Sequence, residues 1–389
     1  MQPDKQPAPP PGETKKTIRT FAFASFFNDM GSDMIYPIWP LFVASLGANM
    51  AVLGLIDGIG NAIVSLSQAL SGYISDRTRK RKVFIWLGYL FGGISRLGYA
   101  LSATWHWLIP FRILDRAGKM RGAPRDAMVA DLSRRSNRGE NFGLIRTLDN
   151  AGALVGIVFC IAAFPLLGYR SLLLIAAVPS FIAVALIAIN IRERPLEDAK
   201  LFKGISFARI DGNFKLFVLL SAVFSLGAFS YSFLLIFAGE FGFQVTTVPV
   251  FYLLFTVVAT FGSYPFGVLS DRIGRKAVLQ ISYGLWGLVC LTMIYADSAW
   301  MVVAAFILFG LHQAGIDTVQ KAFVAELGPA EYRASALGGF QMVIGLCALP
   351  ASVGAGLLWD RFGMQAPFIA SLALTAISAA MLVFVKERP

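Results

Sequence analysis

Four ionisable residues within one apolar stretch fall at helical spacing and could hold an anion. They are Arg112, Asp115, Arg116 and Lys119, at positions i, i+3, i+4 and i+7. This spacing places all four on one face of a helix, where three bases exceed what a single acid can neutralise. Guanidinium groups suit a carboxylate or phosphate because they form two parallel hydrogen bonds with it. The pattern therefore predicts a binding stripe for the anionic end of a small molecule.

Acids of the first apolar run could face this stripe. Counting depth at about 1.5 Å per residue places Asp29 level with Arg116 and Asp33 level with Arg112. We therefore expect both acids to line the same site as the stripe.

Embedded acids near a base are also suited to carrying a proton, because the base competes with the proton for the carboxylate. Asp29 and Asp149 have this setting, and Asp149 follows Arg146 by three residues on one helix. We expect proton coupling to involve Asp29, Asp115, Asp149 and Arg146.

The elements that carry these residues belong to one unit that is written twice. A charged loop motif recurs at an offset of 195 residues, with Gly72, Asp76 and Arg77 in the first copy and Gly267, Asp271 and Arg272 in the second. The same offset aligns Asp126-Ala-Met-Val-Ala-Asp131 with Lys321-Ala-Phe-Val-Ala-Glu326. A repeat at this scale indicates duplicated architecture and is read before other features.

The duplication supplies an internal control for the charges. Uncharged residues stand 195 positions after Asp29, Asp33, Asp57, Arg96, Arg112, Asp115, Arg116, Lys119, Arg146 and Asp149. The fold therefore does not require charge at these places. An ionisable group inside a bilayer costs at least about 2.5–3.5 kcal/mol and indicates function by default.

Composition predicts an all-α membrane protein. Hydrophobic residues make up 56% of the 389-residue chain and charged residues 15%, against about 25% charged residues in soluble domains. Twelve apolar stretches are long enough to cross a bilayer, which takes about 20 helical residues. We expect membrane helices near 18–46, 51–74, 83–103, 105–131, 140–163, 169–191, 213–240, 247–269, 277–297, 299–326, 334–357 and 364–385. The expected divisions are a disordered tail (1–16), a six-helix bundle (17–191), a linker (192–213) and a second six-helix bundle (214–389).

The basic residues predict the orientation in the membrane. Most loop Lys and Arg lie in the two tails and after the even-numbered spans, whereas the opposite loops hold Arg170 and Arg361. This asymmetry predicts a multi-pass protein of the cell inner membrane with both termini in the cytoplasm. It also accounts for the net charge of +11 without nucleic acid as a partner.

Two parallel six-helix repeats that carry Gly-x-x-x-Asp-Arg after their second helix resemble the major facilitator superfamily. The likeness covers nearly the whole chain. It implies alternating access between two rigid bundles, a cavity lined by helices 1, 4, 7 and 10, and a gating role for the motif acid. Asn28-Asp29, Asp57-Gly58 and the run Asp115–Ala127 further resemble a bacterial subgroup of efflux permeases. We expect Asp76, Arg77 and Asp126 to form a gating cluster at the cytoplasmic side.

Part of the embedded charge could instead form structural ion pairs. Acids and bases of the first half are nearly balanced, and Asp57 and Arg96 lie at similar depth on neighbouring helices. These two residues are therefore predicted to pair, as Arg146 and Asp149 also could. Arg121 and Arg125 are predicted to point the other way, away from the binding stripe and from the acids that face it.

The second half is apolar and aromatic at the matching positions. Tyr231 is among the aromatic residues of the seventh span, and the exceptions on the tenth span are His312, Gln313 and Asp317. We expect Tyr231, His312 and Asp317 to contact the apolar end of the substrate. A single His, with no paired Cys or Met spacing, makes a metal path the weaker interpretation of these groups.

No residues combine into a catalytic constellation. The sequence has no phosphate-binding loop with a lysine, so it gives no indication that ATP is used. Cys160, Cys290 and Cys347 all lie in apolar runs and predict neither disulfides nor a metal site. We therefore expect no enzymatic activity, no cofactor and no resident metal.

These patterns favour a monomeric secondary active transporter. Its expected partners are the lipid bilayer, protons and a small organic solute with an anionic or zwitterionic end. One alternative is an exporter of cations or metal ions that uses Asp29, Asp33 and Asp57. Another is a membrane receptor or scaffold that does not transport.

Overall fold

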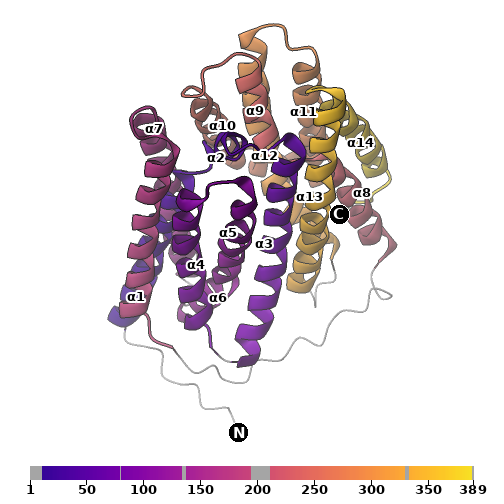
Figure 1. Cartoon of the computed structure of the whole chain (residues 1–389). Coiled ribbons are helices and arrows are strands. Elements are labelled where there is room, and N and C mark those ends of the chain that lie inside the picture. The colour runs from indigo at the N-terminus through magenta and orange to yellow at the C-terminus, as the bar shows by residue number, and fades with distance from the viewer. Residues whose placement is uncertain (1–10, 79, 134–136, 194–210, 329–332, 388–389) are drawn as a thin grey trace. The chain divides into compact units, whose positions relative to one another are not determined.

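A computed structural model describes residues 11–78, 80–133, 137–193, 211–328 and 333–387. Within these ranges every regular element is helical (Figure 1), as predicted. Most of the expected tail 1–16 and of the linker 192–213 lies outside them. Contacts divide the chain into two compact units. Unit 1 comprises Met1–Tyr36, Leu66–Ser102 and Pro110–Phe202, and unit 2 comprises Pro37–Ser65, Ala103–Ile109 and Lys203–Pro389. The boundaries of two successive six-helix bundles stay a prediction.

The helices of the first copy are α1 (Pro11–Asp33), α2 (Trp39–Ser45), α3 (Met50–Thr78), α4 (Lys82–Leu101), α5 (Trp105–Ala117), the 3₁₀ turn η1 (Gly118–Arg121), α6 (Gly122–Leu132) and α7 (Arg138–Asn190). Those of the second copy are α8 (Gly212–Gly227), α9 (Ser232–Glu240), α10 (Val248–Ile273), α11 (Arg275–Ile294), α12 (Ala299–Leu327), α13 (Arg333–Phe362) and α14 (Ala366–Val383). Each expected span corresponds to one of these elements, to a group of them or, for the fifth and sixth spans, to part of α7.

Nine helices among the described residues are long and apolar enough to cross a membrane. The number is smaller than twelve because the fifth and sixth spans run together as α7, whose backbone leaves the helical region at Gly168. The first span is not among the nine because α1 carries polar residues at its start and two acids near its end. The fourth is not among them because it is divided into α5, η1 and α6.

The duplication is visible in the backbone. Gly47 and Gly242 have positive φ angles of 83° and 118°, and they are 195 positions apart. Gly168 and Gly363, with φ angles of 65° and 93°, have the same separation. Such angles favour glycine because a Cβ atom would clash. The two copies therefore turn at equivalent residues.

The first helix of each copy is interrupted, which corrects the expectation of single helices over 18–46 and 213–240. The chain leaves helical geometry between α1 and α2 and again between α8 and α9. In the first copy Pro37 lies in the interruption, and the residue before a proline is disfavoured in the helical region. In the second copy the Ser230 hydroxyl accepts a hydrogen bond from the backbone N–H of Ser232 at 3.2 Å, so a side chain replaces a helical backbone acceptor.

The fourth span is interrupted where Pro124 removes a backbone donor. A proline cannot donate to the carbonyl four residues earlier, and here that carbonyl belongs to Met120. Ser71 Oγ on α3 donates to the Met120 oxygen at 2.8 Å instead. The preceding 3₁₀ turn has about 3.0 residues per turn in place of 3.6, so side chains beyond Gly118 rotate relative to those of α5.

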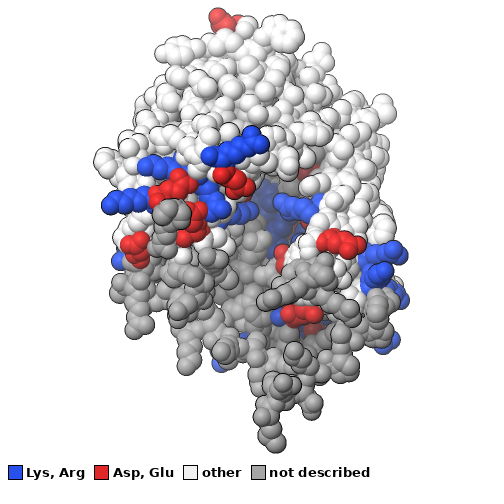
Figure 2. Space-filling model, turned by 180° about the vertical axis from the view of Figure 1, so that it is seen from behind, with Lys and Arg blue, Asp and Glu red and all other residues white. Residues whose placement is uncertain are grey.

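In each copy an arginine that follows the loop motif forms an ion pair with an acid of a later helix, and we call these two ion pairs the loop brace. In unit 1 Arg81 pairs with Asp131, and the backbone N–H of Arg81 donates to Glu193 at 2.8 Å. In unit 2 the arrangement is repeated one residue out of step with the offset of 195: Arg275, 194 positions after Arg81, pairs with Glu326, and its N–H donates to Glu387. On the face in Figure 2, nearly all the coloured charged side chains lie in the middle and lower parts of the view, and the upper part is almost entirely uncharged.

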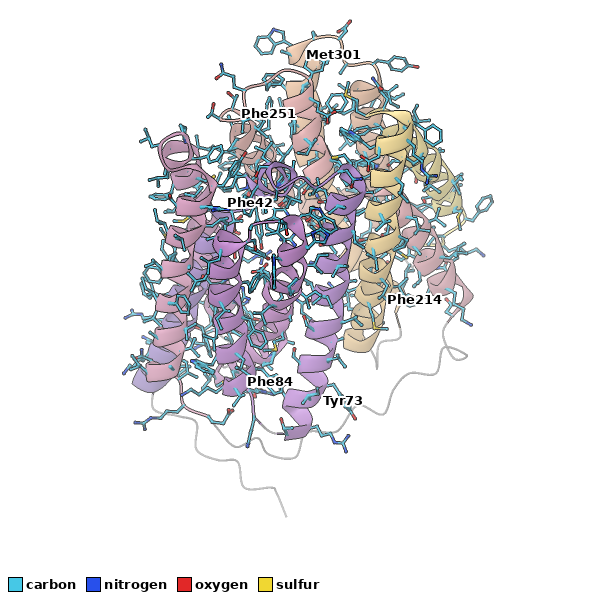
Figure 3. All side chains as sticks on the ribbon, viewed as in Figure 1. Phe42, Tyr73, Phe84, Phe214, Phe251 and Met301 are labelled. Carbon is cyan, nitrogen blue, oxygen red and sulfur yellow. The ribbon has the colours of Figure 1, made fainter. Side chains whose placement is uncertain are left out.

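Unit 1 is built around α7, against which α1 and α4 pack. Gly152 and Gly156 on α7 allow close approach, because a Cβ at either would overlap the carbonyl oxygens of Phe26 and Met30. The buried side chains of this core are Ile18, Phe21, Ile85, Tyr89, Val129, Ile145 and Ile187. Tyr73 and Phe84, on either side of the first loop motif, lie at the same end of this unit (Figure 3).

Unit 2 packs α12 against α10 and α11, and α14 against α8 and α11. Aromatic rings fill much of its interior, including Phe233, Phe237, Tyr283, Trp286, Phe306 and Phe323, all under 2% exposed. Phe251 on α10 and Met301 on α12 lie at the opposite end from Phe214 on α8 (Figure 3). Helices α2 and α3 of the first copy contribute residues 37–65 to this unit, and α2 packs on α9.

The contact between α3 and α13 predicts one strongly sensitive glycine. A Cβ at Gly54 would overlap the Ser352 carbonyl, so Gly54→Ala should lower stability by roughly 1–3 kcal/mol. Gly354 on α13 has nothing within 4 Å of its Cβ position. Gly354→Ala should therefore be neutral or stabilising by at most about 1 kcal/mol. Melting temperatures of the two purified variants test this, and equal values would contradict the close packing.

Candidate functional site

Asp29 of α1 contacts an arginine that a straight helix would have turned away. Arg121 Nη2 lies 3.8 Å from Asp29 Oδ1, and Asn28 Nδ2 donates to the same oxygen at 2.9 Å. The Arg121 guanidinium also stacks over the Tyr89 ring, 4.8 Å from its centroid. The expectation that Arg121 points away from the acids was wrong, because the 3₁₀ turn η1 rotates it toward α1.

Asp149 of α7 faces a second such arginine. Arg125 Nη1 lies 3.8 Å from Asp149 Oδ1 and donates to Ser25 Oγ on α1 at 2.7 Å. Arg125 Nε also donates to Asp126 at 2.9 Å. Arg146, the neighbour expected to act with Asp149, is exposed. The geometric partner of the buried Asp149 is therefore Arg125.

Arg96 is a buried arginine that joins three helices. Its Nη2 donates to Ser32 Oγ at 2.7 Å and to the Asn28 carbonyl at 3.2 Å, both on α1. Its Nη1 donates to the Ala176 carbonyl on α7 at 3.4 Å. The side chain is 1% exposed. Arg96 thus ties α4 to α1 and α7 through backbone and hydroxyl oxygens, a different set of partners from the predicted pair with Asp57.

The binding stripe keeps three of its members on α5 and the fourth on η1. Arg112 is buried, and Asp115 and Arg116 have side chains 13% and 12% exposed. Arg116 Nε lies 3.7 Å from Asp115 Oδ2, and its Nη1 donates to the Tyr36 hydroxyl at 3.3 Å. Lys119 is partly buried on η1. Three bases and one acid therefore occupy neighbouring turns of one partly buried segment in unit 1.

Asp57 of α3 is held by three uncharged donors within unit 2. Trp39 Nε1 donates to Oδ1 at 2.9 Å, and the hydroxyls of Ser230 and Ser232 donate to Oδ2 at 2.7 and 2.5 Å. The Asp57 residue is 2% exposed. These donors lie at the start of α2, in the α8–α9 interruption and at the start of α9. Asp57 therefore connects the first copy of the sequence to the second.

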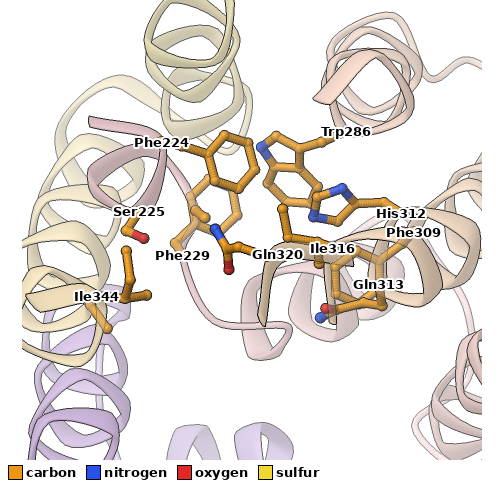
Figure 4. A pocket seen from close by; sticks show the side chains of 12 residues that line it. Phe224, Ser225, Phe229, Trp286, Phe309, His312, Gln313, Ile316, Gln320 and Ile344 are labelled. Atoms are coloured by element: carbon orange, nitrogen blue, oxygen red, sulfur yellow. The ribbon is translucent and has the colours of Figure 1, made fainter. Parts of the chain in front are cut away.

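Unit 2 also contains a cavity of about 190 Å³ (Figure 4). Its walls come from α8, α11, α12 and α13. The lining residues are Phe224, Ser225, Ala228, Phe229, Trp286, Phe309, His312, Gln313, Ile316, Gln320, Ile344 and Ala348. No Asp, Glu, Lys or Arg is among them, so the cavity suits an uncharged group. We call it the aromatic pocket.

Of the three second-copy residues expected at the substrate, the aromatic pocket includes His312. His312 is buried, and its Nδ1 lies 2.8 Å from the Ser282 carbonyl. Tyr231 packs instead against Tyr252 and Phe255 of α10, with ring centroids 5.3 and 6.1 Å away. Asp317 is exposed on α12.

The residues expected to gate the protein occupy the loop end of each unit. A Cβ at Gly72 would lie 3.5 Å from Ala123, and one at Gly267 would lie 3.5 Å from Thr318. Exposed side chains surround these glycines: Arg77 contacts the Tyr73 hydroxyl at 3.5 Å, and Asp271 and Arg272 lie on the surface. The side chain of Asp76 is outside the described set, so its cluster with Arg77 and Asp126 stays a prediction.

Among the described residues, no three His, Cys, Asp or Glu side chains lie close enough together to share a metal ion. Sequence reasoning missed the donors to Asp57 and the contacts of Arg121 with Asp29 and of Arg125 with Asp149. Glu193 of the loop brace was also missed, although a comparison of the two copies could have found it, since Glu387 follows it by 194 positions.

The chain is similar in sequence to several known proteins. A sequence model of the Major Facilitator Superfamily matches residues 21–263 and 216–389. The chain is 37% identical over 383 residues to an uncharacterized MFS-type transporter of Methanocaldococcus jannaschii, with 96% of each chain covered. It is also 22% identical over 386 residues to the multi-drug resistance efflux pump PmrA of Streptococcus pneumoniae, with 94% of each covered.

Solved structures share the fold. A mutant of the nucleoside transporter NupG matches with a TM-score of 0.79 at 16% identity, covering 95% of this chain and 100% of that one. A bacterial homolog of the human lysosomal transporter Spinster, in an inward-facing and occupied conformation, matches with a TM-score of 0.77 at 14% identity, covering 98% and 97%. These matches confirm the predicted arrangement of twelve membrane helices in two parallel six-helix repeats.

The three donors to Asp57 predict a sensitive carboxylate. In Asp57→Asn one acceptor oxygen becomes an NH₂ group that faces a donor, so at least one hydrogen bond is lost at a cost of about 1–3 kcal/mol. We expect the melting temperature of the purified variant to fall clearly. The exposed Asp297 provides the matched control, since Asp297→Asn should change little. Equal melting temperatures for the two variants would show that the Asp57 contacts do not stabilise the fold.

Proposed function

The chain belongs to the major facilitator superfamily, and on that premise we propose that it carries a small organic solute with an anionic or zwitterionic end by alternating access, coupled to protons. Membrane transport and a multi-pass topology follow from the family. The nature of the solute, the coupling ion, a location in the cell inner membrane with both termini in the cytoplasm, and a monomeric state are the proposed parts.

The excess of bases on the binding stripe is the observation that supports an anionic end on the solute. Within residues 105–121 the sequence contains one acid, Asp115. Two acids of α1, Asp29 and Asp33, are also predicted to face the stripe, and Asp29 contacts Arg121. Arg112 and Arg116 remain close to Asp115 on α5, and their forked guanidinium groups match a carboxylate or phosphate. An anionic group on the substrate would balance this charge while it is bound.

The cation and metal alternative has weaker support. Two of the acids it requires are engaged, Asp29 by Arg121 and Asp57 by hydroxyl and indole donors. Likeness to a multi-drug efflux pump favours export of organic compounds as a second candidate. A thermal-shift screen of carboxylates, zwitterions and organic cations separates the candidates, because a ligand stabilises the folded state that it binds. Stabilisation by cations alone would contradict the anionic assignment.

The Arg116 fork provides the first functional test. Arg116→Lys keeps the positive charge but loses bidentate binding, so affinity for a stabilising carboxylate should fall at least about tenfold. The measurement is ligand titration of the purified protein. Arg170→Lys, at an exposed position outside both the stripe and the gating residues, should leave affinity unchanged. If Arg116→Lys lowers the melting temperature but leaves the dissociation constant at the wild-type value, the stripe is structural.

Proton coupling is tested at the two acids that contact arginines, the partly buried Asp29 and the buried Asp149. Asp29→Asn and Asp149→Asn remove the group that could exchange an arginine for a proton. In proteoliposomes at least one variant should retain substrate exchange at equal concentrations but lose accumulation driven by a pH gradient. The exposed Asp297→Asn variant serves as control. Accumulation at the wild-type level in both variants would exclude these acids as the essential proton carriers.

A further inference from the structure

The aromatic pocket contains one buried polar atom whose chemistry selects a ligand. His312 Nδ1 lies 2.8 Å from the Ser282 carbonyl. A carbonyl oxygen only accepts hydrogen bonds, so Nδ1 carries the proton and donates. Burial at 4% exposure among Phe224, Trp286 and Phe309 favours the uncharged ring. Nε2 of a neutral ring with a protonated Nδ1 is an acceptor.

The Nε2 atom is available to a ligand. His312 lines the aromatic pocket beside Trp286 (Figure 4). Within the described part of the chain, the hydrogen bond of the His312 ring is the one that Nδ1 donates to the Ser282 carbonyl. The Nε2 atom is not fully enclosed by protein. A ligand that places an N–H or O–H group here would give this acceptor a hydrogen-bond partner within the pocket.

The surrounding rings are fixed in place before any ligand enters. Trp286 Nε1 donates to Ser371 Oγ at 2.8 Å, which satisfies its polar atom within the protein. Phe224 is stacked on Tyr283 with centroids 4.3 Å apart, and Phe229 packs edge-on against Phe368 at 5.2 Å. Aromatic walls favour a flat ring that can stack on them. Because these walls are already ordered, binding costs little side-chain entropy.

Size and charge narrow the ligand further. The volume of about 190 Å³ somewhat exceeds the roughly 150 Å³ of an engineered cavity that holds benzene. One or two fused rings therefore fit. The lining residues include no Asp, Glu, Lys or Arg, so the group that enters should be uncharged.

We propose that the aromatic pocket binds a flat, uncharged aromatic or heteroaromatic ring of the transported solute, and that His312 Nε2 selects rings that carry an N–H or O–H donor. This inference rests on the proposed function, since it specifies the apolar end of the solute. His312 acts as a specificity-determining residue, and Ser282 fixes the proton on its Nδ1.

The test compares two isosteric probes, indole-3-acetate and benzofuran-3-acetate, on the full-length protein in lipid nanodiscs. They differ only in the ring atom, an N–H donor in the first and an ether oxygen in the second. One hydrogen bond is worth about 0.5–1.5 kcal/mol, so indole-3-acetate should bind roughly two- to twelvefold more tightly. Equal affinities, or no binding of either probe, would overturn the assignment.

Two variants separate the nitrogen atoms of His312. In His312→Asn the amide Nδ2 can replace Nδ1 as the donor to Ser282, but no acceptor remains at the Nε2 position. The preference for indole-3-acetate should disappear while the melting temperature is largely kept. His312→Gln can keep an acceptor near the Nε2 position and loses the donor to Ser282, so it should retain the preference with reduced stability. A preference that survives in His312→Asn would overturn the role of Nε2.

The remaining histidine of the chain is the matched control. His106 is exposed and stacks on Trp105 with centroids 3.6 Å apart, so His106→Asn should leave the preference unchanged. Failure of the inference and failure of the proposed function give different results. Discrimination between the probes with no transport of any anion leaves the pocket assignment standing. Anion transport with equal probe affinities removes the pocket assignment and leaves the proposed function.

Discussion

A charged side chain inside an apolar helix bundle must be given polar partners, and unit 1 is organised by that constraint. Arg96 shows it most directly: this guanidinium is 1% exposed and bonds to oxygens on α1 and α7. Leaving such a group without partners would cost several kcal/mol. Because the partners include backbone carbonyls, they fix the relative rotation of three helices. The same rotation turns Asp29 and Asp149 toward Arg121 and Arg125.

Helix interruptions supply much of the remaining polar chemistry. Irregular backbone is tolerated at membrane depth only where protein groups satisfy it. The carbonyl freed by Pro124 receives the Ser71 hydroxyl, and the turn before it brings Arg121 to Asp29. The interruption between α8 and α9 presents two serine hydroxyls to Asp57. Side chains that a continuous helix would separate are in this way gathered around single carboxylates.

The sequence predicted the fold well because its evidence is long-range and repeated. Twelve apolar spans and a constant offset depend on no detail of local geometry. The contacts of individual charges were harder to predict, since they depend on helix phase. Counting along a straight fourth helix placed Arg121 on the wrong side, because one 3₁₀ turn shifts every later side chain. The pairing of Asp57 with Arg96 was inferred from depth alone, and depth gives no information on the hydroxyl and indole donors that hold the carboxylate.

Comparison of the two copies separates contacts that the fold needs from contacts that a particular activity needs. The loop brace is present in both, with Arg81 and Asp131 matched by Arg275 and Glu326, so selection for the architecture is enough to explain it. The buried polar groups at the sites are not duplicated: Arg112 corresponds to Ile307, and His312 corresponds to Ala117. A bundle with isoleucine or alanine at these positions is already built once within this chain. The repeated architecture therefore does not require Arg112 or His312, and both lie where the proposed binding stripe and the aromatic pocket would use them.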